Sequence, residues 1–293
     1  MALRPTEQAN PLSVGIDAMT SIEFCRVMNR LDADVPLAVA EVLPRIAAAI
    51  DVVAVRMAEG GRLFYFGAGT SGRLGVLDAT ELLPTFGLDP SQSIGLIAGG
   101  SGALVGAIEG AEDDPELAVA DLASHGLGPA DVVIGIAASG GTPYVLGGLG
   151  YAREVGAASI SIACNPDAAT TAAADIGIEV VPGPEILTGS TRLRAGTAQK
   201  LVLNMISTGS MVQLGKTYTN LMVDVQPTNA KLRDRAERIV ATITDADPAP
   251  LLAASEGDVK VAVVMGLTDT DAATARELLL AAKGRVRGAV STG

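Results

Sequence analysis

The chain of 293 residues has no tryptophan, one histidine and two cysteines, and only 3% of its residues are aromatic. His125 is the single imidazole and sits in a polar turn, so we expect neither a His-based catalytic triad nor a His-rich metal site, and no metal. Cys25 and Cys164 lie far apart in apolar surroundings, which indicates reduced core residues rather than a disulfide. Few aromatic rings leave few platforms on which nucleic-acid bases could stack.

Basic clusters and long apolar runs are missing as well. The formal net charge is −12, and such a surface repels a phosphate backbone, so we expect no nucleic acid as a partner. No segment approaches the roughly 18 consecutive apolar residues that span a bilayer, and the first residues lack the apolar core of a signal peptide. We therefore expect a cytoplasmic protein that does not enter membranes.

The middle of the chain alternates between short apolar runs and helical segments. The expected strands cover 62–67, 93–98, 131–137, 158–163 and 176–181, and the expected helices between them cover 72–83, 102–123 and 142–154. Near-continuous apolar strands separated by helices predict a parallel sheet that is buried on both faces. The sequence therefore predicts an α/β fold, a three-layer αβα sandwich around a mainly parallel sheet.

Helical segments flank this middle part. A polar leader, too hydrophilic for a core element, is expected to lie across a partner surface, and a long amphipathic helix over 35–58 follows it, kinked or divided at Pro44. Another long helix is expected over 194–214. We predict three parts: an N-terminal leader with helices at 1–50, a central domain at 51–228, and a small C-terminal domain of three or four helices at 229–293.

The turn Gly67-Ala68-Gly69-Thr70-Ser71-Gly72, called the first turn below, joins an expected strand to an expected helix. A Gly-rich turn at a helix N-terminus directs backbone N–H groups and the positive end of the helix dipole at one spot, which favours an anion. The glycine spacing matches only part of a dinucleotide motif, and the acidic residue that would hold a ribose is missing. Hydroxyl groups at Thr70 and Ser71 favour a phosphomonoester over a dinucleotide or a turn that binds nothing.

A second turn of the same kind, Ala138-Ser139-Gly140-Gly141-Thr142, follows the expected strand 131–137. Ligands of open α/β sheets bind outside the carboxyl ends of the strands, so we expect the two turns to share one ligand. A third polar loop over 188–192 adds Ser190 as a candidate contact. Nearby cations either bind phosphate or pair with acidic side chains; these are Arg192, Arg194 and Lys200.

Two glutamates are candidates for proton transfer. In a chain with one histidine, the acid and base for chemistry on a phosphosugar must come from carboxylates, lysines or tyrosines. Glu81 lies close to the helix end that Pro84 enforces. Glu112 lies in an acidic turn, for which a solvated face or a helix cap is the alternative interpretation.

Longer motifs extend these observations. They are Gly67–Glu81, Pro84–Gly87, Ala111–Asp113, Ala137–Ser139, Thr142–Tyr144, Leu187–Arg192, Ala195–Asn204, Asn220–Gln226 and the leader residues Thr6–Gln8 and Asn10–Pro11. Together they resemble the N-acetylmuramic acid 6-phosphate etherases, lyases of the sugar isomerase (SIS) fold. The resemblance covers roughly residues 5–235, and the remainder matches in helical pattern only.

The resemblance implies cleavage of the D-lactyl ether at C3 of N-acetylmuramic acid 6-phosphate with water, giving N-acetylglucosamine 6-phosphate and D-lactate in peptidoglycan recycling. It implies no cofactor or metal, and a homodimer with sites near the subunit boundary. The ring-opened aldehyde acidifies the C2 proton, a base removes it, lactate leaves from C3, and water adds to the alkene. The implied site residues are Glu112 as base, Glu81 as acid, and Thr70, Ser71, Ser139, Thr142 and Ser190 as substrate contacts.

The chain departs from the family pattern at a few positions. Gly141 replaces an arginine in the second turn, which removes a cation there, Ala9 replaces an arginine in the leader, and Leu82-Leu83 replaces Cys-Pro. Three other functions compete with the lyase: a non-catalytic phosphosugar sensor resembling glucokinase regulatory protein, an aldose–ketose isomerase, and a dinucleotide-dependent oxidoreductase.

Overall fold

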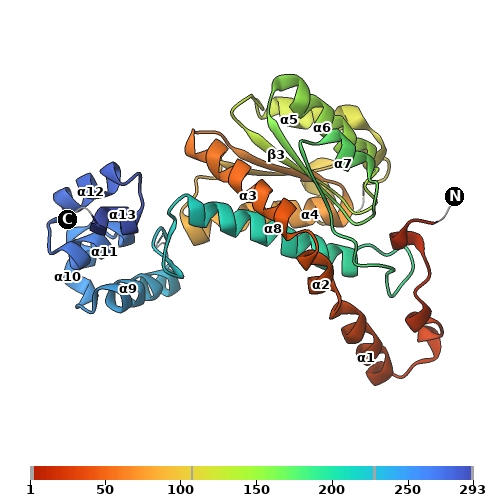
Figure 1. The fold of residues 1–293 in the computed structure, drawn as a ribbon, viewed down its shortest axis with the longest axis horizontal. Coiled ribbons are helices and arrows are strands. Elements are labelled where there is room, and N and C mark those ends of the chain that lie inside the picture. Colours follow the sequence, from red (N-terminus) through yellow and green to blue (C-terminus); the bar gives the residue numbers. More distant parts are fainter. Residues whose placement is uncertain (1–2, 107, 227–228, 292–293) are drawn as a thin grey trace. The chain divides into compact units, whose positions relative to one another are not determined.

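The computed structural model describes residues 3–106, 108–226 and 229–291 (Figure 1). Their contacts divide the chain into two units: unit 1 comprises Met1–Thr80 and Ser91–Ser207, and unit 2 comprises Glu81–Pro90 and Thr208–Gly293. Two long helices, α4 (Gly69–Phe86) and α8 (Arg194–Gln213), begin in unit 1 and end in unit 2. The three-part division at residues 50 and 228 stays a prediction.

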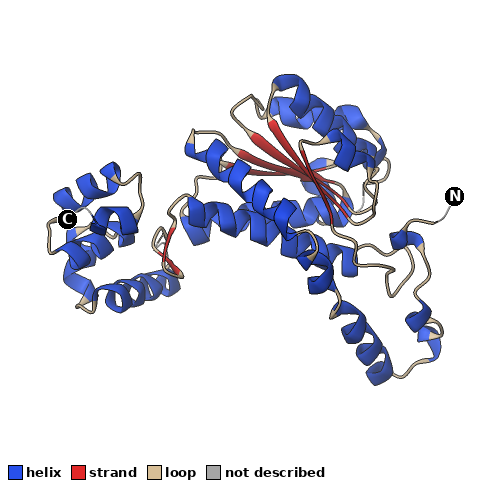
Figure 2. Ribbon diagram, in the orientation of Figure 1, coloured by secondary structure: helices blue, strands red, loops and turns tan. Residues whose placement is uncertain are grey.

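Unit 1 is built around a parallel five-stranded sheet with the strand order β2-β1-β3-β4-β5 (Figure 2). The strands are β1 (Leu63–Gly67), β2 (Ser93–Ile97), β3 (Val132–Ala137), β4 (Ala158–Ala163) and β5 (Ile176–Glu179). Every residue of β1, β3 and β4 is buried. Strands buried on both faces carry near-continuous apolar runs, which is why their positions could be predicted from the sequence.

Helices cover both faces of the sheet. One face carries α3 (Leu43–Ala58) with the unit 1 parts of α4 and α8, and the other carries α5 (Pro115–Ser124), α6 (Pro143–Val155) and α7 (Ala169–Ala173) (Figure 1). Between the sheet and α5 and α6, Phe66 packs directly on the backbone of α6, where a Cβ at Gly148 would lie 2.3 Å from the ring. The predicted three-layer αβα sandwich is confirmed.

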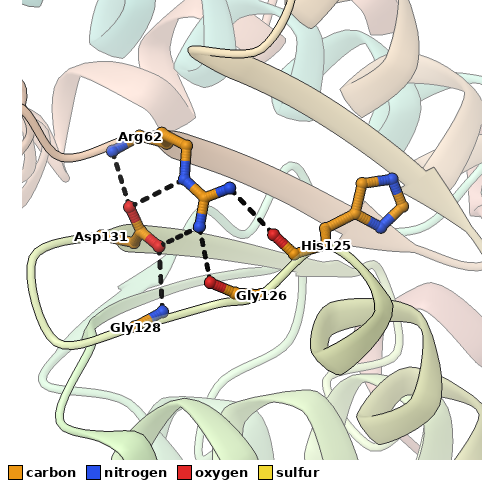
Figure 3. Close-up of polar contacts among 5 residues, drawn as sticks. All are labelled: Arg62, His125, Gly126, Gly128 and Asp131. Carbon is orange, nitrogen blue, oxygen red and sulfur yellow. Dashed lines mark hydrogen bonds and ion pairs between the residues drawn. The ribbon is translucent and has the colours of Figure 1, made fainter.

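An ion pair lies at the amino end of the sheet, where β1 and β3 begin (Figure 3). The guanidinium of Arg62 donates to both carboxylate oxygens of Asp131, at 3.2 and 2.7 Å, and to the carbonyl oxygens of His125 and Gly126, at 2.8 and 2.7 Å. Asp131 also accepts the backbone N–H groups of Arg62 and Gly128. These hydrogen bonds lower the pKa of Asp131, although burial acts to raise it.

The N-terminal part is helical, as predicted, and differs from the prediction at Cys25. It contains short 3-10 helices η1 (Pro5–Glu7), η2 (Pro11–Ser13) and η3 (Ile16–Ala18), then α1 (Ser21–Asp32), α2 (Val35–Ala40) and α3. The expected long helix is divided, with Pro44 in the first helical turn of α3, where its missing N–H needs no partner. Cys25 is exposed on α1, which corrects the expectation of a buried cysteine, whereas Cys164 is buried.

The leader packs against unit 1 of its own chain with Thr6 and Asn10 buried, which corrects the expectation that it is too polar for the core. That it also lies across a partner surface stays a prediction. The amide oxygen of Asn165 accepts the backbone N–H and the hydroxyl of Thr6, at 3.2 and 3.3 Å, and Nδ2 of Asn10 donates to Pro184 O at 3.0 Å. Thr6 is 1% exposed and Asn10 is 4% exposed. Polar residues can be buried here because their hydrogen-bonding groups find partners.

The described residues of unit 2 form a two-stranded hairpin, β6 (Thr217–Tyr218) and β7 (Leu221–Met222), and five further helices, where three or four were expected. These helices are α9 (Ala230–Thr244), α10 (Pro248–Ala254), α11 (Val259–Thr268), α12 (Ala272–Ala281) and α13 (Val286–Ser291). The apolar α11 forms the centre of the unit 2 core. Asp224 bridges Lys216 and Lys260, at 2.9 and 2.7 Å. Among the described helices, none is sufficiently long and apolar to cross a bilayer.

Candidate active site

The first and second turns line one pocket of about 420 Å³ in unit 1. They meet because β1 and β3 are neighbours in a parallel sheet, so their carboxyl ends lie at the same edge. The pocket is lined by Arg4, Glu7, Ala68, Gly69, Thr70, Ser71, Glu112, Asp113, Ile136, Ala137, Ala138, Ser139, Gly141, Thr142, Pro143, Gly189 and Thr191. The structure therefore gathers most of the predicted site residues around one hollow.

The first turn is held by a buried side chain of α8. The turn is so tight that a Cβ at Gly72 would lie 2.5 Å from O of Gly67 in the same turn, so position 72 requires glycine. The hydroxyl of Ser71 donates to Oε1 of Gln199 at 3.0 Å. Gln199 is 1% exposed, and its Nε2 has no hydrogen-bond partner among the described residues. The hydroxyl of Ser71 is thus held from α8.

The second turn carries two hydroxyl groups at the N-terminus of α6. Oγ of Ser139 and Oγ1 of Thr142 lie 3.3 Å apart, and the N–H of Gly141 donates to Ser139 Oγ at 3.3 Å. Thr142 is the N-cap residue, but its side chain makes no capping hydrogen bond. A helix N-terminus without a side-chain cap, placed beside two hydroxyls, favours an anionic ligand.

The leader supplies a cation to the pocket. Nη1 of Arg4 donates to Ser139 O at 2.9 Å. A Cβ at Gly141 would lie 3.3 Å from the same Nη1. Among the described residues that line the pocket, Arg4 is the only cation, beside the carboxylates of Glu7, Glu112 and Asp113.

Glu112 reaches the pocket from a short 3-10 helix, η5 (Ala111–Asp113). The segment expected to be helical over 102–123 is divided into η4 (Gly100–Leu104), η5 and α5, because Gly110 at φ +75° precedes η5 and Asp114 caps α5. The side chain of Glu112 is exposed, and it also lines an adjoining hollow of about 310 Å³. Its position between two hollows is open to a ligand.

Two predicted residues are not among those that line the pocket. Glu81 is exposed on α4, eleven residues after Thr70, and belongs to unit 2. Ser190 is half-buried, and its two neighbours, Gly189 and Thr191, line the pocket in its place. One pocket of a single chain thus contains Glu112 but lacks Glu81.

The N-terminus of α8, in contrast, is occupied by a carboxylate of the same chain. The buried carboxylate of Glu185 accepts the backbone N–H groups of Arg194 and Ala195, at 2.8 and 2.9 Å. Burial raises the pKa of Glu185, against the lowering effect of these hydrogen bonds. The guanidinium of Arg194 donates to Pro184 O, so Arg194 has a structural role, and neither Arg192 nor Lys200 lines the pocket.

A buried carboxyl group lies between α4 and α8. Nδ2 of Asn204 and the hydroxyl of Ser207 donate to Oδ1 of Asp78, at 2.6 and 3.2 Å. Burial raises the pKa of Asp78, although these hydrogen bonds and the charge of Lys200 act to lower it. The network joins the helix that follows the first turn to the helix that carries Gln199.

Sequence reasoning missed three residues of the site. These are Arg4, Asn165 and Gln199. Asn165 is fully buried, and its Nδ2 donates to the carbonyl oxygens of Ala138 and Ser139, at 3.2 and 3.3 Å, which links the leader to the second turn. Only Gln199 lies in a recognised motif, and a lone arginine or asparagine carries no local signal. The described residues include no cluster of three or more His, Cys, Asp or Glu side chains that could hold a metal ion.

A parallel αβα sandwich with hydroxyl-bearing turns around a pocket at its carboxyl edge defines an SIS-domain protein. A model of the glucokinase regulatory protein N-terminal SIS domain matches residues 45–153, and a general SIS domain model matches residues 117–209. The fold is similar to that of a phosphoheptose isomerase from Francisella tularensis, with a TM-score of 0.51 at 16% identity over 66% of this chain and 100% of that chain. At that identity the likeness concerns the fold alone.

Curated relatives are much more similar. A protein from Streptomyces coelicolor is 57% identical over 289 residues, which cover 98% of this chain and 93% of the relative. A protein from Mycolicibacterium smegmatis is 52% identical over 291 residues, which cover 98% of each chain. A protein from Pectobacterium atrosepticum is 54% identical, over 98% of this chain and 96% of the relative. All three are named N-acetylmuramic acid 6-phosphate etherase. The chain belongs to the N-acetylmuramic acid 6-phosphate etherase family.

Proposed function

We propose that this protein is a lyase that cleaves the D-lactyl ether of N-acetylmuramic acid 6-phosphate with water, giving N-acetylglucosamine 6-phosphate and D-lactate. The observation that carries the proposal is the pocket in which two hydroxyl-bearing turns meet Glu112, in a chain 57% identical to a named etherase. A regulator of the same fold would need the turns but not the two glutamates. The reaction belongs to the recycling of peptidoglycan sugars in the cytoplasm.

The phosphate group is proposed to bind between the two turns. Hydroxyl groups at Thr70, Ser139 and Thr142 donate to its oxygens, and Ser71 does so when its hydroxyl turns from Oε1 of Gln199 to the ligand. The N-termini of α4 and α6 add their partial positive charge. Ser190 contacts the sugar from the third loop. Binding at C6 places the sugar so that its C2 and C3 can lie against Glu112.

The chemistry is proposed to proceed on the ring-opened aldehyde. Glu112 removes the C2 proton, the electron pair forms a C2–C3 double bond, and the C3–O bond breaks as Glu81 protonates the departing lactate. Water then adds at C3 and gives a proton to Glu81, and Glu112 returns a proton to C2. One water is consumed, and both glutamates return to their starting states, as general acid–base catalysis requires.

We propose that the active form is a homodimer with its sites near the subunit boundary, as the resemblance to the etherase family implies. In it, Glu81 of the partner subunit completes the site next to Glu112. A closed twofold arrangement would build two equivalent sites, each from both chains.

The test is incubation with N-acetylmuramic acid 6-phosphate in heavy water, with D-lactate and deuterium at C2 measured together. The proposal expects both to form. Tight sugar phosphate binding by calorimetry without lactate would favour the sensor. A ketose phosphate without lactate would indicate an isomerase, and a change in NAD fluorescence would indicate an oxidoreductase.

A further inference from the structure

The pocket has an unfavourable charge balance for an anionic substrate. Three carboxylates line it, from Glu7, Glu112 and Asp113, and they belong to a chain of net charge −12. A phosphate monoester carries close to two negative charges at neutral pH. Neutral hydroxyls and helix N-termini offset this charge only in part, so the single lining cation, Arg4, has a large influence on binding.

Arg4 is held in place by the leader that carries it. Two residues further on, Thr6 is buried and bonded to Asn165, which in turn donates to the carbonyl oxygens of the second turn. Asn10 fixes the other end of this segment to Pro184. The backbone of the leader is therefore attached to the same turn whose hydroxyl groups line the pocket.

The guanidinium of Arg4 lies at the second turn. It donates to Ser139 O, and its Nη1 would be 3.3 Å from a Cβ at Gly141, so the absence of a side chain at position 141 gives it room. That hydrogen bond uses one N–H of a group that carries five. The remaining donors of a planar guanidinium match the oxygens of a phosphate in bidentate geometry.

We propose that Arg4 is a substrate-binding residue that pairs with the phosphate group of the sugar phosphate at the second turn. The leader thus acts as part of the site and supplies positive charge to a pocket whose other described lining residues carry none. This inference rests on the proposed function for the identity of the ligand. It assigns the lactyl carboxylate, the substrate's other anion, to a different part of the site.

The test is the variant Arg4→Gln in the full chain, assayed for lactate release and, by calorimetry, for binding of N-acetylglucosamine 6-phosphate. Loss of a charge-assisted hydrogen bond to phosphate is expected to raise KM and to weaken product binding about 10- to 100-fold, with kcat within about threefold of the parent. Arg4→Lys should recover part of the affinity, because it keeps the charge but loses the bidentate geometry. Product affinity in Arg4→Gln should also depend less on salt than in the parent.

Arg233→Gln is the matched control, since it removes the same charge from an exposed position on α9. Equal KM and product affinity in Arg4→Gln and Arg233→Gln would overturn the inference. So would a raised KM with unchanged product affinity, which would mean that Arg4 binds the lactyl carboxylate. If the parent protein releases no lactate but Arg4→Gln still loses affinity for the sugar phosphate, the proposed reaction fails and the phosphate contact stands.

Discussion

The two edges of the sheet in unit 1 differ in whether their polar groups are paired within the chain. At the amino edge, Arg62 and Asp131 satisfy each other and the surrounding backbone (Figure 3). At the carboxyl edge, the N-cap side chain of Thr142 makes no capping bond, and hydroxyl groups line an open pocket. Groups that are satisfied within the chain stabilise the fold, whereas donors left open at a helix N-terminus are available to a ligand.

The helix N-termini at the carboxyl edge also differ from one another. The N-terminus of α8 is occupied by the buried carboxylate of Glu185, while the N-termini of α4 and α6 line the pocket. A helix N-terminus is therefore a site only where the protein has not supplied the anion itself. By this distinction, changes at the carboxyl edge should affect activity, and changes at the amino edge should affect stability.

The largest expected effect is on the chemistry, from Glu112→Gln. Without a base at C2, lactate release should fall about 10²- to 10⁴-fold, and deuterium exchange at C2 should fall with it. The thermal midpoint should stay close to that of the parent, because the side chain is exposed. Coupled lactate assays and proton NMR in heavy water measure both rates.

Glu81→Gln provides the comparison for this variant. It should slow lactate loss more than C2 exchange, because the proposed acid acts on the leaving group after the proton has been removed. Exchange lost in Glu81→Gln and kept in Glu112→Gln would reverse the two roles.

The next largest effect should be on stability, from Asp131→Ala. Removing the carboxylate leaves two backbone N–H groups without their acceptor and leaves the guanidinium of Arg62 with the carbonyl oxygens of His125 and Gly126. We expect a cost of about 2–3 kcal/mol. Because the pKa of Asp131 is lowered, this stability is present above the usual pKa of 3.8 and is lost as the pH falls. Urea unfolding at pH 7 and pH 3 should show the difference shrinking in acid, and a large loss of kcat at pH 7 would contradict the division between the edges.

Asp78→Asn should give the opposite pH dependence. Burial raises the pKa of Asp78 above 3.8, so its stabilising contribution is greatest when it is protonated and decreases as the pH rises through the raised pKa. The neutral amide does not lose stability in this way, so the variant should gain stability relative to the parent as the pH rises above 3.8. Paired urea titrations across this range measure the trend, and a constant difference would show that Asp78 titrates normally.

The smallest effect is expected from Gln199→Leu. The change removes a buried, unpartnered Nε2 and also removes the acceptor that orients the Ser71 hydroxyl. KM should rise a few-fold while kcat is kept, and the free energy of unfolding should change by less than about 1 kcal/mol. A fall in kcat at unchanged KM would place Gln199 outside phosphate binding.

The sheet and its two turns could be predicted because their signals are local. Buried parallel strands are continuous apolar runs. A Gly-rich turn between a strand and a helix is typical of anion binding at a helix N-terminus. The leader could not be predicted, since its buried position depends on Asn165, 159 residues away from Thr6. For the same reason the contact between Arg4 and Ser139 has no local signal in the sequence. The exposure of Cys25 depends on packing that its apolar neighbours do not reveal.

The most direct test of the central claim is a crystal structure of Glu112→Gln with N-acetylmuramic acid 6-phosphate bound. The account predicts the phosphate between the hydroxyls of Ser71, Ser139 and Thr142, and C2 of the sugar within hydrogen-bonding reach of residue 112. A phosphate bound elsewhere, or a sugar whose C2 faces away from residue 112, would contradict it.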